Sequence, residues 1–265
     1  MEQEIVSSLF IEQFRLGHPV PEESYLARLP VVRQLKKMGG IQLSSSVTFF
    51  VGENGVGKST LIEALAVSSG FNPEGGTINF NFSTQDSHSE LYRYLKVVRG
   101  GIRPKTGFFL RAESFYNVAT EVDRLEETPL GPSLLASYGG ISLHRQSHGE
   151  SFMALVENRF GRQGLYILDE PEAALSPMKQ MSLLCEIDRL VRDGSQFIIS
   201  THSPILITFP GAEVFQLTKQ KIEKVDYHQT EHFQLTKAFL NAPEKMLGYL
   251  LEDGKEPSGD RKSVV

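Results

Sequence analysis

The sequence has few of the residues and segments that mark several protein classes. Its 265 residues include one cysteine, Cys185, so no disulfide can form within the chain. No apolar run approaches the ~20 residues that cross a bilayer, and the first residues, MEQE, are acidic where a signal peptide is basic. We therefore expect a cytoplasmic protein without a membrane-inserted segment. Because Cys185 lies between leucines and an isoleucine, we expect its side chain to be buried.

Zinc-ligand patterns and an excess of positive charge are also missing. No group of His and Cys residues has the spacing of zinc ligands. The formal net charge of −5 gives no overall attraction to nucleic acid. Residues 91–105 are a local exception, with five basic side chains, two tyrosines and no acidic side chain. This segment predicts either a nucleic-acid contact or a solvated basic helix face.

The chain does contain a series of short apolar runs, each bounded by polar or turn residues. Their lengths and β-branched or aromatic content are typical of buried strands, and the longer segments with helical spacing between them are typical of crossover helices. The pattern predicts an α/β fold with a mostly parallel sheet in a single domain over residues 1–251. The polar residues 252–265 are rich in Gly, Pro and charge and predict a disordered tail. The expected strands are 47–51, 107–110, 165–168 and 196–200, the expected helices are 59–68, 177–192 and 232–251 with an interruption near Pro243, and a terminal hairpin is expected at 213–217 and 222–227.

A glycine-rich loop follows the first expected buried strand and precedes a helix. It fits the pattern G-x-x-x-x-G-K-[ST], in which backbone N–H groups and a helix N-terminus surround a phosphate. Lys58 is expected to reach the β and γ phosphates of a nucleotide, and the Ser59 hydroxyl is expected to bind Mg²⁺. The residues of this phosphate-binding loop are Gly52, Glu53, Asn54, Gly55, Val56, Gly57, Lys58, Ser59 and Thr60.

Two carboxylates, Asp169 and Glu170, follow the apolar run 165–168. A buried strand ending here would bring Asp169 to the same Mg²⁺ ion as Ser59. Glu170, one residue further on, would polarise the attacking water. A strand that merely ends in an acidic loop is common, so other motifs must decide the class of enzyme.

Those further motifs resemble the ABC ATPase superfamily in both sequence and order. Residues 146–151 are similar to the family's signature motif, residues 171–176 stand at the position of the D-loop, and residues 200–204 match the loop with the switch histidine, His202. The resemblance implies an ABC-type nucleotide-binding domain with a small helical lobe at about residues 114–160 and antiparallel strands near both ends. It also implies that ATP and Mg²⁺ are bound and that Glu170 and His202 are catalytic.

The signature motif implies a dimer. In the family, this motif contacts the γ-phosphate held by the partner subunit, so the resemblance implies a homodimer in the ATP state. Ser147 and the Gly149 N–H are the expected phosphate contacts, at a helix N-terminus. The nucleotide-binding residues implied in this motif are Ser147, His148, Gly149 and Glu150.

Two positions of the family pattern stay open. The residue in place of the family's Q-loop glutamine is either Gln85 or, at the end of an expected strand, Arg111 or Glu113. The residue that contacts adenine is not identified, and the candidates near the opening strand are Phe14, Arg15 and Tyr25.

Within the superfamily, residues 50–55, 70–76, 109–115 and 147–151 look like those of a family of bacterial stand-alone ATPases related to RecF, SMC and OLD-type heads. Only about thirty residues separate Phe115 from Gln146, too few for the long coiled coil of an SMC protein. This resemblance implies a soluble ATPase in DNA maintenance or phage defence, with nucleic acid or a protein as the partner. The alternatives are an energy-coupling ATPase subunit of a membrane transporter and a nucleotide-gated protein-binding module with little turnover.

Overall fold

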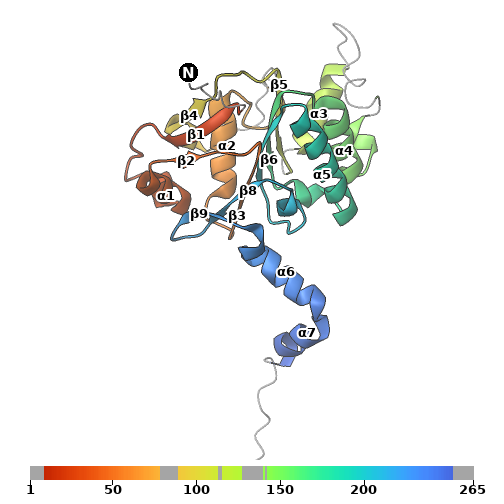
Figure 1. Ribbon diagram of the computed structural model, residues 1–265. Coiled ribbons are helices and arrows are strands. Elements are labelled where there is room, and N and C mark those ends of the chain that lie inside the picture. The colour runs from red at the N-terminus through yellow and green to blue at the C-terminus, as the bar shows by residue number, and fades with distance from the viewer. Residues whose placement is uncertain (1–8, 78–88, 113–114, 127–139, 141, 253–265) are drawn as a thin grey trace, which may run out of the picture.

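The computed structural model describes residues 9–77, 89–112, 115–126, 140 and 142–252. Their strands form a six-stranded sheet in the order β5-β6-β7-β3-β8-β9 and a three-stranded sheet in the order β2-β1-β4 (Figure 1). The strands are β1 (Ile11–Leu16), β2 (Ile41–Gln42), β3 (Val47–Gly52), β4 (Leu95–Arg99), β5 (Thr106–Arg111), β6 (Gly164–Asp169), β7 (Gln196–Ser200), β8 (Glu213–Leu217) and β9 (Ile222–Val225). The α-helices are α1 (Pro30–Met38), α2 (Lys58–Ser69), α3 (Phe115–Glu126), α4 (His148–Arg159), α5 (Pro177–Arg192), α6 (Glu231–Asn241) and α7 (Pro243–Glu252).

The larger sheet is mostly parallel, as the sequence predicts. β5, β6, β7, β3 and β8 run parallel, and β9 is antiparallel to β8. Every residue of β3, β6 and β7 is buried, because helices cover both faces of a parallel sheet. The three strands of the smaller sheet pair antiparallel. The expected antiparallel strands near both ends of the domain are therefore present.

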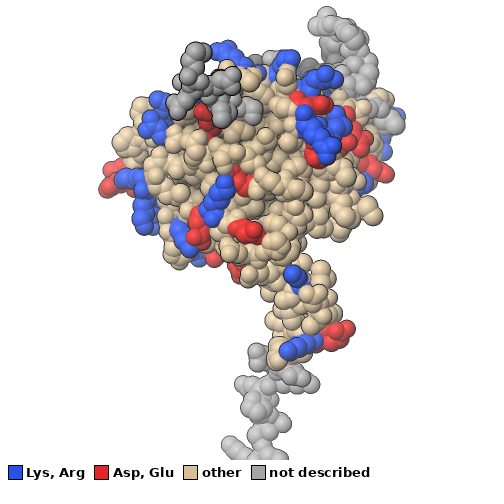
Figure 2. Space-filling model, in the orientation of Figure 1, with Lys and Arg blue, Asp and Glu red and all other residues tan. Residues whose placement is uncertain are grey.

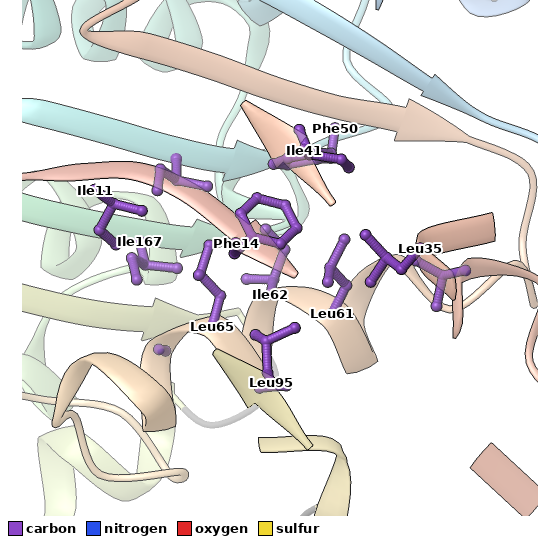
Figure 3. Close-up of a cluster of buried hydrophobic side chains, with 14 of the residues drawn as sticks. Ile11, Phe14, Leu35, Ile41, Phe50, Leu61, Ile62, Leu65, Leu95 and Ile167 are labelled. Carbon is purple, nitrogen blue, oxygen red and sulfur yellow. The ribbon is translucent and has the colours of Figure 1, made fainter. Parts of the chain in front are cut away.

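Two hydrophobic clusters lie on opposite faces of the larger sheet. Alternate strand residues enter different clusters, so Phe49 packs with the side chains of α4 and α5 while Phe50 packs with those of α2 and the smaller sheet. Figure 3 shows the second cluster, in which Phe14 from β1 and Leu65 from α2 meet near Ile167 of β6. The smaller sheet and α2 thus share one core with the larger sheet.

One buried side chain, Gln196 at the start of β7, joins the two sheets. Its Oε1 accepts hydrogen bonds of 2.9 Å from the backbone N–H groups of Phe10 and Ile11, and its Nε2 donates to the Ile11 carbonyl oxygen at 2.9 Å. A buried amide is stable only when such partners are present. This contact fixes β1 against the larger sheet.

The C-terminal part consists of the predicted hairpin followed by α6 and α7. The two helices meet at Pro243 and project away from the body of the molecule (Figure 1). No residue of α6 is buried. The expected disordered tail lies, except for Glu252, outside the described residues. In the described part of the chain, no helix has the length and apolar character needed to span a membrane.

Two expectations about local structure are wrong. Cys185 is exposed on α5, because Leu183 and Ile187 face the core and the residue midway between them points elsewhere on a helix. The basic segment around residue 96 is not a helix face, because Leu95–Arg99 forms β4 and pairs with β1.

Candidate functional site

The parallel register of the larger sheet brings three polar strand ends into one row. Arg111 at the end of β5 pairs with Asp169 of β6, and Asp169 pairs with Ser200 of β7. Ser200 in turn pairs with Phe50, two residues before the end of β3. The glycine-rich loop that follows β3 therefore starts beside these side chains, at the edge where ligands bind in open α/β sheets.

The loop between β3 and α2 encloses a small cavity of about 200 Å³. Gly57 has a φ of 99°, and a Cβ at this position would lie 2.6 Å from the Val31 Cγ1 of α1. The Val31 N–H also donates to the Val56 carbonyl oxygen at 3.1 Å, so α1 supports the loop from behind. The cavity is lined by Asn54, Gly55, Gly57, Lys58, Ser59, Thr60 and Glu170.

Lys58, the first residue of α2, is buried at the loop. Its Nζ donates to the carbonyl oxygens of Gly52 at 2.8 Å and Glu53 at 3.0 Å. Burial lowers the pKa of Lys58, and the nearby carboxylates, Glu170 first among them, act in the opposite direction. A cation so placed is suited to a phosphate group with several negative charges.

Asp169 is buried beside Ser59 and is held by three neighbours. It accepts a short hydrogen bond from the Ser200 hydroxyl, and the Arg111 Nε lies 3.6 Å from its Oδ2. Burial raises the pKa of Asp169, while the hydrogen bonds from Ser200 and Ser59 and the charge of Arg111 lower it. The Ser59 contact brings a hydroxyl and a carboxylate together, a donor pair of the hard oxygen type that Mg²⁺ takes alongside phosphates.

Arg111 joins this carboxylate to α2. Its Nη1 lies 2.6 Å from the Glu63 Oε2, and Glu63 is itself buried. Among the three candidates for the Q-loop position, the structure places Arg111 at the site, whereas Gln85 and Glu113 lie outside the described residues. Sequence reasoning missed Glu63, whose position inside a helix gives no motif.

Glu170 has a strained backbone at the end of β6. Its φ of 51° and ψ of 52° are left-handed, which is uncommon for a residue with a side chain. Such outliers persist only where the surroundings hold them, and they gather at functional sites. The Glu170 N–H donates to the Ser200 carbonyl oxygen at 3.0 Å, and the side chain, 40% exposed, lines the cavity.

His202 follows β7 and faces Glu170. Its Nε2 lies 3.5 Å from the Glu170 Oε1 and is a buried atom with no hydrogen-bond partner among the described residues. Its backbone N–H donates to the Glu172 Oε1 at 2.6 Å, a contact that sequence reasoning also missed. Burial, with the charges of Lys58 and His232, lowers the pKa of His202 to about 4. The ring is therefore neutral, and its Nε2 lies beside the Glu170 carboxylate, which lines the cavity.

The signature segment, residues 146–151, lies apart from this cavity. None of its four residues that are expected to bind nucleotide is in the cavity lining. Ser147 caps α4: its N–H and Oγ donate to the Glu150 Oε2 at 3.0 and 2.6 Å. A Cβ on Gly149 would lie 3.0 Å from the Ala174 carbonyl oxygen and 2.9 Å from the Lys179 Cδ. The start of α4 thus packs against the turn that follows Glu170.

The three adenine candidates have different surroundings. Phe14 is fully buried in the core, so its ring cannot stack on a base and that candidate is wrong. Arg15 lines a second cavity, of about 700 Å³, between the end of β1 and α1. The Tyr25 ring is exposed, and its hydroxyl donates to the Ser89 Oγ at 3.1 Å.

Metal ligands of the zinc type are missing from the described residues, where no three His, Cys, Asp or Glu side chains are grouped to hold an ion. The Ser59 and Asp169 pair is too small a set to hold a metal alone. It fits an ion that also takes oxygen ligands from a bound phosphate.

Four features of this site together define the P-loop NTPase class. They are a buried strand, the glycine-rich loop that follows it, a buried lysine and a carboxylate at the end of a nearby strand. Comparisons with known proteins agree. Residues 32–121 match the family model of an AAA domain, and residues 140–207 match that of an AAA ATPase domain. A curated relative from Haemophilus influenzae, described as an uncharacterized ABC transporter ATP-binding protein, is 27% identical, and the match covers 66% of this chain and 71% of the relative.

Two solved structures are similar at a lower level. An inward-facing metal-chelate type ABC transporter has 18% identity and a TM-score of 0.44, over 76% of this chain and 80% of that one. CbiO1 from Clostridium perfringens, part of the ABC transporter complex CbiONQ, has 16% identity and a TM-score of 0.46. That match covers 92% of this chain and 99% of CbiO1. The two family models and the curated relative support the assignment of this chain to the ABC-type P-loop NTPases, with ATPase activity of the ABC/AAA type.

The lowered pKa of His202 predicts how stability depends on pH. Between about pH 4 and 6.5 the unfolded chain binds a proton at His202 that the folded protein does not, so acidification through this range destabilises the fold. His202→Gln removes this contribution. We expect urea unfolding at several pH values to show a smaller loss of stability in the variant than in the wild type. An equal loss in both proteins would contradict the burial of a neutral His202.

Proposed function

We propose that two copies of this chain close over two ATP molecules and hydrolyse them in composite sites. Each site combines the phosphate-binding loop of one copy with Ser147 and Gly149 of the other. One observation carries the proposal: within a single chain, Glu170 and the loop share a cavity that the signature segment does not reach. A helix N-terminus such as that of α4 is a suitable anion contact, and it is available to a second copy.

The phosphates are bound by the loop N–H groups and by Lys58, which exchanges its contacts with the Gly52 and Glu53 carbonyl oxygens for phosphate oxygens. Ser59 and Asp169 would hold Mg²⁺ together with the nucleotide. When bound, the ion would supply positive charge that stabilises the phosphates. Arg111 and Ser200 hold the Asp169 carboxylate in place for this role.

The attacking water is positioned by Glu170 and His202. The left-handed backbone aims the Glu170 carboxylate into the cavity, where it can accept a proton from water. The unpartnered Nε2 of His202 provides a hydrogen-bond donor for the γ-phosphate. The two groups lie 3.5 Å apart, so one water molecule can contact both, while a phosphate oxygen can accept from His202.

Glu170→Gln tests the proposed site. The variant keeps the shape of the side chain but loses the proton acceptor, so we expect ATP hydrolysis to fall by at least about 100-fold. Because ATP binding is unaffected, the variant should accumulate as an ATP-bound dimer in light scattering. Lys58→Ala should weaken ATP binding itself, and Glu157→Gln, an exposed change on α4, should behave as the wild type. A Glu170→Gln protein that stays monomeric at saturating ATP would rule out the composite site.

The proposed dimer also needs a partner that responds when it closes over ATP. A basic surface on the chain supports nucleic acid as that partner. Arg15 of β1 and Lys96 of β4 are both exposed, and they lie opposite each other where the two strands pair. Because Arg15 also lines the cavity of about 700 Å³, the basic segment around Lys96 lies beside that cavity. Figure 2 shows Lys and Arg side chains over the region of β1, β4 and α1. The charged residues of the cavity lining are Arg15, Glu22, Arg28, Arg33 and Lys36, with a single carboxylate among them.

We therefore propose a nucleic-acid backbone as the partner, in line with a role in DNA maintenance or phage defence. The description of the Haemophilus influenzae relative favours the alternative, an ATPase subunit that drives a membrane transporter. The two differ in what the ATP-bound dimer binds.

Charge reversal on this surface separates the two alternatives. Each phosphate contact contributes about one unit to the slope of log affinity against log salt. The substitutions are made in the Glu170→Gln protein, and binding of duplex DNA is measured with ATP present. We expect Arg15→Glu and Lys96→Glu each to reduce the slope by about one. Lys219→Glu, in the exposed turn of the β8-β9 hairpin, is the matched control and should leave the slope unchanged. No salt-sensitive affinity in filter binding would exclude the nucleic-acid partner and favour the transporter alternative.

A further inference from the structure

His232 lies on the first turn of α6, between the phosphate-binding loop and His202. Its Nε2 is 3.4 Å from the Gly52 carbonyl oxygen and 3.3 Å from the Nδ1 of His202. The two rings meet edge to face, with centroids 4.9 Å apart and an interplanar angle of 74°. No sequence motif contains His232, and the reaction proposed above assigns it no task.

One arrangement of protons makes hydrogen bonds of both His232 contacts. A carbonyl oxygen only accepts, so the His232 Nε2 must carry a hydrogen to bond Gly52. The same N–H then faces the Nδ1 of His202, which has to be the bare, accepting nitrogen. In a neutral imidazole the other nitrogen carries the proton, so the His202 Nε2 is an N–H donor. This is the nitrogen that lies 3.5 Å from the Glu170 Oε1.

His232 is partly buried, and the space beside it is small. The space bordered by β3, the end of β8 and the start of α6 is about 10 Å³, at or below the volume one water molecule needs. Thr230, the N-cap residue of α6, is fully buried, and its Oγ1 donates to the Tyr227 carbonyl oxygen at 2.7 Å. This space is too small for a bridging water, and the contact between His232 and His202 is direct.

We propose that His232 is a positioning residue, which fixes His202 in the tautomer with its N–H directed at Glu170 and the reacting phosphate. His232 itself touches neither group. Because it is part of α6, the orientation of the catalytic histidine depends on where this helix begins. The kinetic consequence rests on the proposed ATPase function, whereas the tautomer of His202 does not.

The direct test is the protonation pattern of the His202 ring. In the full-length protein labelled with ¹⁵N-histidine, long-range ¹H–¹⁵N spectra distinguish a protonated ring nitrogen from a bare one, and His202→Gln identifies the His202 signals. We expect a protonated Nε2 and a bare Nδ1 in the wild type. His232→Leu, which removes the donor, should give a mixture of both tautomers. An unchanged His202 pattern in a folded His232→Leu protein would overturn the proposal.

A kinetic comparison separates positioning from packing. His232→Leu should lower kcat for ATP about tenfold, the effect of one lost hydrogen bond, with KM unchanged. His232→Gln keeps an N–H donor and should restore most of kcat and the wild-type tautomer. His228→Leu, a nearby exposed histidine paired with Asp226, is the control and should match the wild type.

Each outcome has a distinct meaning. Equal losses in His232→Gln and His232→Leu would show a packing role and overturn the proposal. If no variant and no wild-type protein hydrolyses ATP while the tautomer still responds as expected, the proposed function fails and the positioning role of His232 stands.

Discussion

The candidate site depends on the register of four parallel strands. Pairing of β5, β6, β7 and β3 puts Arg111, Asp169 and Ser200 in one row beside the phosphate-binding loop. Because strand side chains alternate between faces, a slip of one residue in β6 would turn Asp169 away from Ser59. The buried apolar residues on both faces of these strands prevent that slip. The chemistry at the edge of the sheet is thus fixed by packing in its interior.

The sequence predicted the parts of the site that local patterns define. Short apolar runs gave the parallel strands, and the loop from Gly52 to Thr60 and the Asp169-Glu170 pair stand at strand ends as expected. Residues that reach the site only through tertiary packing were missed: Glu63 meets Arg111 across 48 positions, and His232 meets Gly52 across 180. Cys185 was misjudged because its neighbours along the chain are not its neighbours on the helix face. The segment around Lys96 pairs with a distant strand, which no local signal reveals.

The geometry also suggests how the two sites of the proposed dimer would depend on each other. The 3₁₀ turn Pro171–Ala174 directly follows Glu170, which lines the cavity of its own chain. It ends at Ala174, whose carbonyl oxygen lies against Gly149, at the start of the signature helix that serves the other copy. In the proposed dimer, this short turn would connect the proposed catalytic carboxylate of one site to the proposed phosphate contact of the other. His232 adds a second connection, from the C-terminal helices to His202.

The central claim is that each complete site needs two copies of the chain, and a mixing measurement tests it most directly. Lys58→Ala disables the loop of a subunit, and Ser147→Arg disables its signature segment. If the site is composite, each variant alone is inactive, but a mixed dimer has one intact site. With random pairing and independent sites, an equimolar mixture should recover about a quarter of the wild-type ATPase rate. A mixture that remains inactive while the two variants are shown to pair, or a Ser147→Arg protein that is fully active alone, would contradict the account.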